Sequence, residues 1–137
     1  MLGDVMGAVA MTMNWQAPRP AEVCDAGPKP VDFGYLHRFT AGDRALEREV
    51  LYLFAQSAHG YVAQMRDAHD AKSWNAATHT LKGSARAVGA WRAARAAEMA
   101  EKCAFDGDDD RRAFLIDMAE EATDEAIGFI VQVFPET

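Results

Sequence analysis

The chain has 137 residues, half of them hydrophobic, and its 14 basic and 21 acidic side chains give it a formal net charge of −7. This length suits one domain with a modest core, no apolar run approaches the ~20 residues that cross a bilayer, and the first residues lack the basic leader of a signal peptide. Because Cys24 and Cys103 lack the spacing of a metal site or a disulfide framework, we expect reduced thiols in a cytoplasmic protein. We also expect that the protein binds neither membranes nor nucleic acid.

Residues 1–30 are predicted to form an N-terminal extension that is flexible or loosely docked. They are rich in Gly, Pro, Ala and Met, and the prolines from Pro18 to Pro30 oppose a regular helix. Within the extension, Val5–Trp15 is apolar enough to form one helix that docks on the rest of the chain. The remaining residues, 31–137, are predicted to form one helical bundle domain.

The first part of this domain is predicted to hold a short helix and then a long one. The short helix spans about Asp32–Phe39, and Thr40 with Asp43 three residues later is interpreted as a capping pair for the next helix. The long helix is expected to run to about His69, because its apolar residues recur at steps of three and four. The expected buried stripe of this helix is Leu46, Val50, Leu53, Ser57, Tyr61 and Met65.

Three more helices are predicted in the second half of the chain. One spans about Asp70–Val88 and ends at Gly89 in a left-handed conformation, and a shorter one follows over about Ala90–Phe105. The acidic run 106–110 lacks the glutamate that closes a calcium loop, so we interpret it as a turn that caps the last helix, about Asp110–Val133. The side chains that this last helix is expected to bury are Phe114, Met118, Ala122, Ile127, Ile130 and Phe134.

No segment alternates polar and apolar residues with a period of two, so no sheet is predicted. Four main helices joined by short turns predict an all-α fold, an antiparallel four-helix bundle with a short leading helix. Because the chain carries four long helices of its own, we expect it to be a monomer.

His79 stands out on the third predicted helix because the apolar stripe of that helix points away from it. This stripe consists of Trp74, Ala77, Leu81, Ala85 and Val88. The residues that share the face of His79 at about 100° per residue are Asn75, Lys82, Gly83 and Arg86. Residues 71–97 contain no Asp or Glu but five basic side chains, which predicts a positive local field suited to an anionic group. An ordinary surface histidine on a solvated basic helix remains the alternative.

Gly83 is the second unusual residue of this face. Glycine in a helix interior costs ~1 kcal/mol relative to alanine, which indicates that something requires the missing side chain at this exposed position. Gly83 lies one turn from His79, where it leaves room for a tetrahedral group on the ring and for the surface of a partner. Helix packing is the other explanation, and it is disfavoured because Gly83 points away from the apolar stripe.

The segment His79–Ala85, followed by Val88–Ala90, resembles the signature of histidine-containing phosphotransfer (HPt) domains of bacterial multistep phosphorelays. The resemblance extends upstream to Val31 and downstream to Glu98. Two positions where the family commonly has leucine hold alanine in this chain, Ala94 and Ala97. The resemblance implies a phosphocarrier and not an enzyme, since no nucleotide-binding motif accompanies the histidine helix.

The resemblance implies that His79 accepts a phosphoryl group from the aspartate of a receiver domain and passes it to another receiver. It also implies that the attacking atom is Nε2 and that a neighbouring residue holds Nδ1. Lys82 is expected to stabilise the equatorial oxygens and Gly83 to give access, with Asn75 and Arg86 in supporting or partner-facing positions. The implied partners are receiver domains of response regulators and hybrid histidine kinases. We expect no cofactor or metal on this chain, because the Mg²⁺ belongs to the acidic pocket of the receiver.

Two other functions remain open at this stage. The bundle is either a binding module that docks on a kinase or receiver and inhibits it, or the dimerising bundle of a degenerate histidine kinase. The other histidines, His37, His59 and His69, lack the spacing of metal ligands and are expected at the surface.

Overall fold

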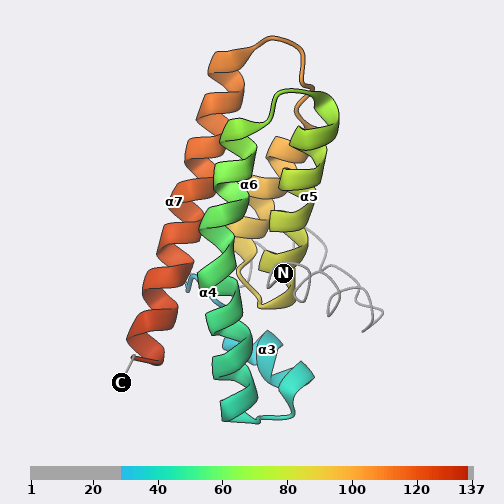
Figure 1. Ribbon diagram of the computed structural model, residues 1–137. Coiled ribbons are helices and arrows are strands. Elements are labelled where there is room, and N and C mark those ends of the chain that lie inside the picture. The colour runs from blue at the N-terminus through green and yellow to red at the C-terminus, as the bar shows by residue number, and fades with distance from the viewer. Residues whose placement is uncertain (1–28, 136–137) are drawn as a thin grey trace.

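The computed structural model describes residues 29–135, in which five α-helices and no strand are found (Figure 1). The helices are α3 (Phe33–Thr40), α4 (Arg44–Asp67), α5 (Ala71–Ala87), α6 (Trp91–Lys102) and α7 (Asp109–Val133). The all-α prediction is therefore confirmed for the described part of the chain. The helix predicted over Val5–Trp15 lies outside the described residues.

Helices α4, α5, α6 and α7 form a ring in which each packs on the next and α7 packs back on α4. Figure 1 shows that the chain reverses its direction from each of these helices to the following one. The short helix α3 packs against α4 at one end of the ring. Among the described helices, none is both long enough and apolar enough to cross a membrane.

Aspartate side chains cap the start of four of the five described helices. Asp32, Asp43, Asp70 and Asp108 each accept a hydrogen bond from the backbone N–H three residues further on, at 2.8 to 3.1 Å. Such caps satisfy amides that lack a helical partner, and the carboxylate favours the positive end of the helix dipole. The predicted capping pair is wrong for Thr40, which ends α3, and Asp43 caps α4 without it.

The buried face of α4 differs from the predicted one in the first half of the helix. Leu46 is 42% exposed, whereas Glu47 beside it is fully buried, so the predicted stripe is wrong at Leu46. Because this buried position holds a charged residue, the hydrophobic pattern of the sequence does not reveal the buried face. Glu47 is tolerated in the protein interior because its carboxylate contacts the His37 ring and accepts a hydrogen bond from the Thr40 hydroxyl. The stripe residues whose burial is confirmed are Tyr61 and Met65, and those that are partly buried are Val50, Leu53 and Ser57.

The buried face of α7 is also rotated from the predicted one. Phe114 is 63% exposed, whereas Leu115 and Ile116 are each 7% exposed, so the predicted burial of Phe114 is wrong. Helix α7 packs on both α6 and α4, so its buried face includes the side chains directed at each of these two neighbours. The other predicted residues are partly buried (Met118, Ala122 and Ile127) or buried (Ile130 and Phe134).

Hydrogen bonds hold both ends of the α5–α6 pair in place, through Asp32 at the turn between the helices and directly from α5 to α6 at the other end. Gly89 turns the chain with a φ of +77°, which confirms the left-handed stop, and its carbonyl accepts a 2.9 Å hydrogen bond from the Asp32 amide. The Asp32 carboxylate also accepts one from Trp91 Nε1 at 3.0 Å. At the other end, Trp74 Nε1 donates to the Ala100 carbonyl at 2.9 Å. These contacts fix the register of α6 against α5.

Alanines form the buried side of α6. They are Ala93, Ala94, Ala96, Ala97 and Ala100, all at most 6% exposed. The distance between two packed helices depends on the side chains at their contact, so small residues here let α6 lie close to α5. Polar side chains at the edge of this contact therefore reach from one helix to the other.

Candidate functional site

His79 lies near the middle of α5, and 71% of its side chain is exposed. The apolar residues of the same region are at most 1% exposed, namely Trp74, Ala77, Leu81, Ala85 and Val88. The prediction that His79 faces solvent, away from the apolar stripe, is therefore confirmed. The histidine is not a core residue.

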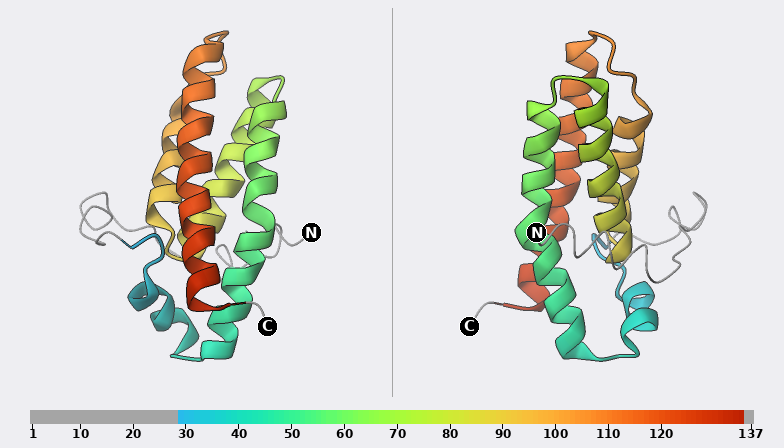
Figure 2. Two further views of the ribbon diagram at one scale, coloured as in Figure 1. Left: turned by 90° about the vertical axis from the view of Figure 1, so that its left-hand side faces the viewer. Right: turned by 45° about the vertical axis from the view of Figure 1, so that its right-hand side comes forward.

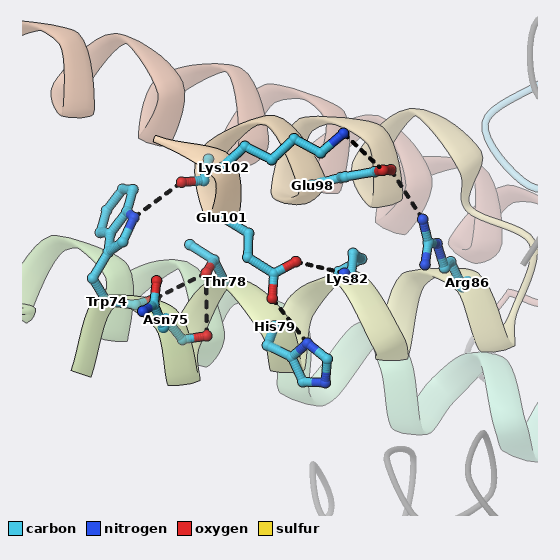
Figure 3. A network of polar contacts seen from close by, with 10 residues as sticks. Trp74, Asn75, Thr78, His79, Lys82, Arg86, Glu98, Glu101 and Lys102 are labelled. Atoms are coloured by element: carbon cyan, nitrogen blue, oxygen red, sulfur yellow. Dashed lines mark hydrogen bonds and ion pairs between the residues drawn. The ribbon is translucent and has the colours of Figure 1, made fainter. Parts of the chain in front are cut away.

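A carboxylate from α6 holds the ring of His79 and also the ammonium of Lys82 (Figure 3). Glu101 Oε2 lies 2.9 Å from His79 Nδ1, and Glu101 Oε1 accepts a hydrogen bond from Lys82 Nζ. Figure 3 shows the other ring nitrogen of His79, Nε2, on the side away from Glu101. One residue of α6 thus brings together two of the residues predicted on α5.

This contact selects a tautomer of the neutral imidazole. Because a carboxylate only accepts hydrogen bonds, the proton of the neutral ring belongs on His79 Nδ1, where it is donated to Glu101. Nε2 then keeps its lone pair and faces solvent. The arrangement gives a nucleophilic nitrogen in an accessible position with its orientation fixed by the hydrogen bond.

Glu101 is ionised at neutral pH in this setting. Burial opposes its ionisation, but hydrogen bonds from Lys82 and His79 outweigh that effect and lower the pKa of the carboxyl below its ordinary value. The carboxylate is therefore present as a negative charge beside the ring. It stabilises any positive charge that the imidazole acquires.

A second ion pair joins α5 to α6 one helical turn away. Arg86 Nη2 lies 2.9 Å from Glu98 Oε2, and Lys102 Nζ lies 3.5 Å from Glu98 Oε1. The α5–α6 seam is the name used below for His79, Lys82 and Arg86 of α5 together with Glu98, Glu101 and Lys102 of α6. The positive field predicted around His79 is reduced at this seam, because the two glutamates of α6 pair with the basic side chains of α5.

Gly83 and Asn75 share the face of His79 without contributing to these contacts. A Cβ built on Gly83 meets no atom of residues 29–135 within 4 Å, so packing among these residues does not require the glycine. The surface one turn after His79 is open as a result. Asn75, one turn before His79, is exposed, and its backbone carbonyl accepts a hydrogen bond from the Thr78 hydroxyl at 3.2 Å.

A family model described as Hpt domain matches residues 49–127, which is more than half of the chain. The chain belongs to the Hpt domain family. The match runs from α4 into α7 and includes every residue of the α5–α6 seam. Comparison with curated proteins and with solved structures gives no match.

Glu98 and Glu101 are the residues of this Hpt domain that sequence reasoning missed. They lie 12 and 22 residues from their partners Arg86 and His79, so no local motif contains both members of a pair. One signal exists in the sequence. The two glutamates stand three residues apart on a helix that is otherwise rich in alanine, so they project from the same side of it.

The three other histidines of the Hpt domain chain are partnered by single carboxylates. His37 contacts Glu47, His59 contacts Asp124, and His69 Nε2 lies 3.7 Å from Asp70 Oδ2. Within residues 29–135, no group of three or more His, Cys, Asp or Glu side chains has an arrangement that holds a metal ion. The predicted surface positions of these histidines are confirmed, since all three are exposed.

Proposed function

We propose that this protein accepts a phosphoryl group from the aspartate of a receiver domain on His79 Nε2 and passes it to the aspartate of another receiver. Hpt domains are phosphocarriers that perform histidine phosphotransfer in phosphorelays. The observation that carries the proposal for His79 is its exposed ring, whose Nδ1 is bound to Glu101 while Nε2 faces solvent.

The reaction follows from these contacts. The lone pair of Nε2 attacks phosphorus, the bond between phosphorus and the aspartyl oxygen breaks, and the electron pair of that bond stays on the released carboxylate. No proton moves, because Nδ1–H is already in place. The phosphorylated ring carries a positive charge that Glu101 stabilises at 2.9 Å. Attack by the aspartate of a second receiver reverses these steps.

The other predicted residues have supporting roles in this proposal. Lys82 shares Glu101 with His79 and stabilises the phosphoryl oxygens as charge develops on them. Gly83 leaves open space through which a receiver approaches. Arg86 is held by Glu98, so it acts at longer range, and Asn75 is exposed on the partner-facing side.

The chain carries no cofactor in this proposal, and the Mg²⁺ of the reaction sits in the acidic pocket of the receiver. The phosphoryl group comes from a partner and not from ATP. The partners are receiver domains of response regulators and hybrid histidine kinases, which the protein meets in the cytoplasm as a monomer.

Labelling by phosphorylated receivers tests the proposal. Receiver domains encoded in the same genome, each phosphorylated with radioactive phosphate, are mixed with the purified chain. We expect a label that is labile in acid and stable in base, which distinguishes a phosphohistidine from an inert docking module. His79→Gln should abolish the label. A wild-type chain that stays unlabelled by every receiver would contradict the proposed function.

His59 provides a matched control for this substitution. It is an exposed histidine whose ring also contacts a carboxylate of a neighbouring helix, Asp124 of α7. His59→Gln should therefore keep the full label. Loss of the label in both variants would indicate a general effect of histidine replacement and not a specific phosphoacceptor. The mass in solution separates the proposal from a kinase-like dimer, because we expect a monomer.

A further inference from the structure

A shallow groove between α6 and α7 is not used by the proposed function. Its volume is about 280 Å³, and its floor is formed by Ala96 and Met99 of α6 with Met118 and Ala122 of α7. Met99 is 43% exposed, and Phe114, one helical turn before Met118, is 63% exposed. Exposed apolar side chains gathered at one place mark a contact surface.

Charged side chains of both signs border this groove. Arg92 and Arg95 line it on α6, and Glu121 and Glu125 line it on α7. Arg92 Nη1 lies 2.9 Å from Glu125 Oε2, so this pair bridges the two helices at the end nearest the α5–α6 turn. A border with balanced charge offers little attraction to a strongly charged partner. The groove therefore suits an apolar segment with few charges.

The described chain begins beside that same end of the groove. Asp32 is hydrogen-bonded to Gly89 in the turn before α6 and to Trp91, the first residue of α6, which immediately precedes Arg92. Both views of Figure 2 show the segment before α3 close to the start of α6. The point at which residues 1–28 join the described chain therefore lies next to the groove.

The N-terminal part of the chain contains a segment whose composition fits this surface. Among residues 1–15 the single charged side chain is Asp4. The large apolar residues at steps of three and four are Leu2, Val5, Met6, Val9 and Met13. In helical form these five side chains occupy a stripe about 100° wide on one face. Methionine side chains adapt to shallow, irregular apolar surfaces, which matches a floor that itself contains two methionines.

The connecting chain is long enough for this contact. Helix α6 has 12 residues and is therefore ~18 Å long. The residues numbered 16 to 28 form a connection that extends to at most ~43 Å at about 3.3 Å per residue. Residues 1–15 consequently reach every part of the groove. Tethering also raises their effective concentration at the groove to the millimolar range, so a weak contact is enough.

We propose that residues 2–13 dock within the same molecule in the α6–α7 groove, with their apolar stripe against Met99 and Met118. The groove lies on a different side of α6 from Glu101 and Glu98, which are about 160° and about 100° away from Met99 around the helix. None of the residues that line the groove belongs to the α5–α6 seam, so docking leaves His79 accessible. This docking does not depend on phosphotransfer.

The methionines of the full chain provide the test. NMR spectra with ¹³C-labelled methionine methyl groups should show close contacts between Met6 or Met13 and Met99 or Met118. Met65 is 1% exposed in the core and serves as an internal reference. A Val5→Asp, Val9→Asp double variant should abolish these contacts and shift the Met99 signal, while the Met65 signal stays in place.

Variants of the groove give the reciprocal test. Met99→Glu should move the signals of Met6 and Met13 to the positions they have in a synthetic peptide of residues 1–15. Leu46→Glu is the matched control, because Leu46 is 42% exposed on α4 and lies outside the groove. The absence of methyl contacts in the wild-type chain would overturn the proposal. Contacts that arise only between labelled and unlabelled molecules would overturn it too, and would assign the groove to a second copy.

Discussion

Replacement of Glu101 by glutamine tests the chemistry at the centre of the seam. The amide oxygen still accepts a hydrogen bond from His79 Nδ1, so the ring keeps its orientation while the negative charge is lost. Two unit charges 4 Å apart interact by ~1 kcal/mol in water and by ~4 kcal/mol at an effective dielectric constant of 20. Because 71% of the His79 side chain and 24% of the Glu101 side chain are exposed, solvent screening brings the value to ~1–2 kcal/mol.

This energy acts on the rate of transfer, because the imidazole becomes positive only as Nε2 bonds to phosphorus. Glu101→Gln should therefore slow transfer from a phosphorylated receiver by about 5- to 30-fold in a single-turnover assay. Glu98→Gln is the control, since it removes the other carboxylate of the seam without a contact to His79. Its rate should stay within about twofold of wild type. Equal rates for the two variants would refute the role assigned to Glu101.

Gly83→Ala should raise the free energy of unfolding by ~0.5–1 kcal/mol, because the added Cβ meets no atom of the described residues within 4 Å and a helix interior favours alanine. Urea unfolding measures this change, and a destabilised variant would show that the helix itself needs the glycine. Glu47→Gln should lower the free energy of unfolding by ~1–3 kcal/mol, because the buried carboxylate joins His37 to Thr40. The same unfolding experiment checks it, and an unchanged midpoint would contradict the argument. Burial opposes ionisation of Glu101, but its hydrogen bonds lower the pKa of the carboxyl below the ordinary value of 4.5. The contribution of Glu101 to stability is therefore full above about pH 4.5 and is lost as the pH falls through the lower pKa of the folded state. The stability difference between wild type and Glu101→Gln should therefore shrink on acidification below that pH, and a constant difference would exclude this linkage.

Local signals predict the ends of the helices well, because a cap acts within three residues of itself. The predicted stop at Gly89 and the predicted cap within the acidic run 106–110 coincide with the end of α5 and the start of α7. The buried faces are harder to predict. In a ring of four helices each helix touches two neighbours, and the pattern does not tell which of two adjacent rows faces the core. The predicted burial of Phe114 is wrong for this reason, and at Leu46 the adjacent row that faces the core also contains a charged residue, Glu47.

In the candidate site too, the features that depend on one helix are predictable and those that depend on the packing of two helices are not. The outward position of His79 follows from the periodicity of one helix, and the sequence predicts it correctly. The partner of His79 does not follow from that helix. Glu101 is 22 residues away, and its position depends on the register of α6 against α5, which the contacts of Trp74 and Asp32 set at the two ends. Such a register is a tertiary property that no local spacing contains.

The sharing of one carboxylate explains how the seam accommodates charge in the proposed reaction. Before transfer, Glu101 neutralises Lys82 and holds the Nδ1 proton of His79. When the phosphoryl group reaches Nε2, the ring becomes positive and attracts Glu101 more strongly, while the phosphoryl oxygens offer Lys82 a new anionic partner. Each charge thus gains a partner as another is drawn away, and no unpaired charge is created. Because the same exchange runs backward at similar cost, one histidine is suited both to receive the group and to release it.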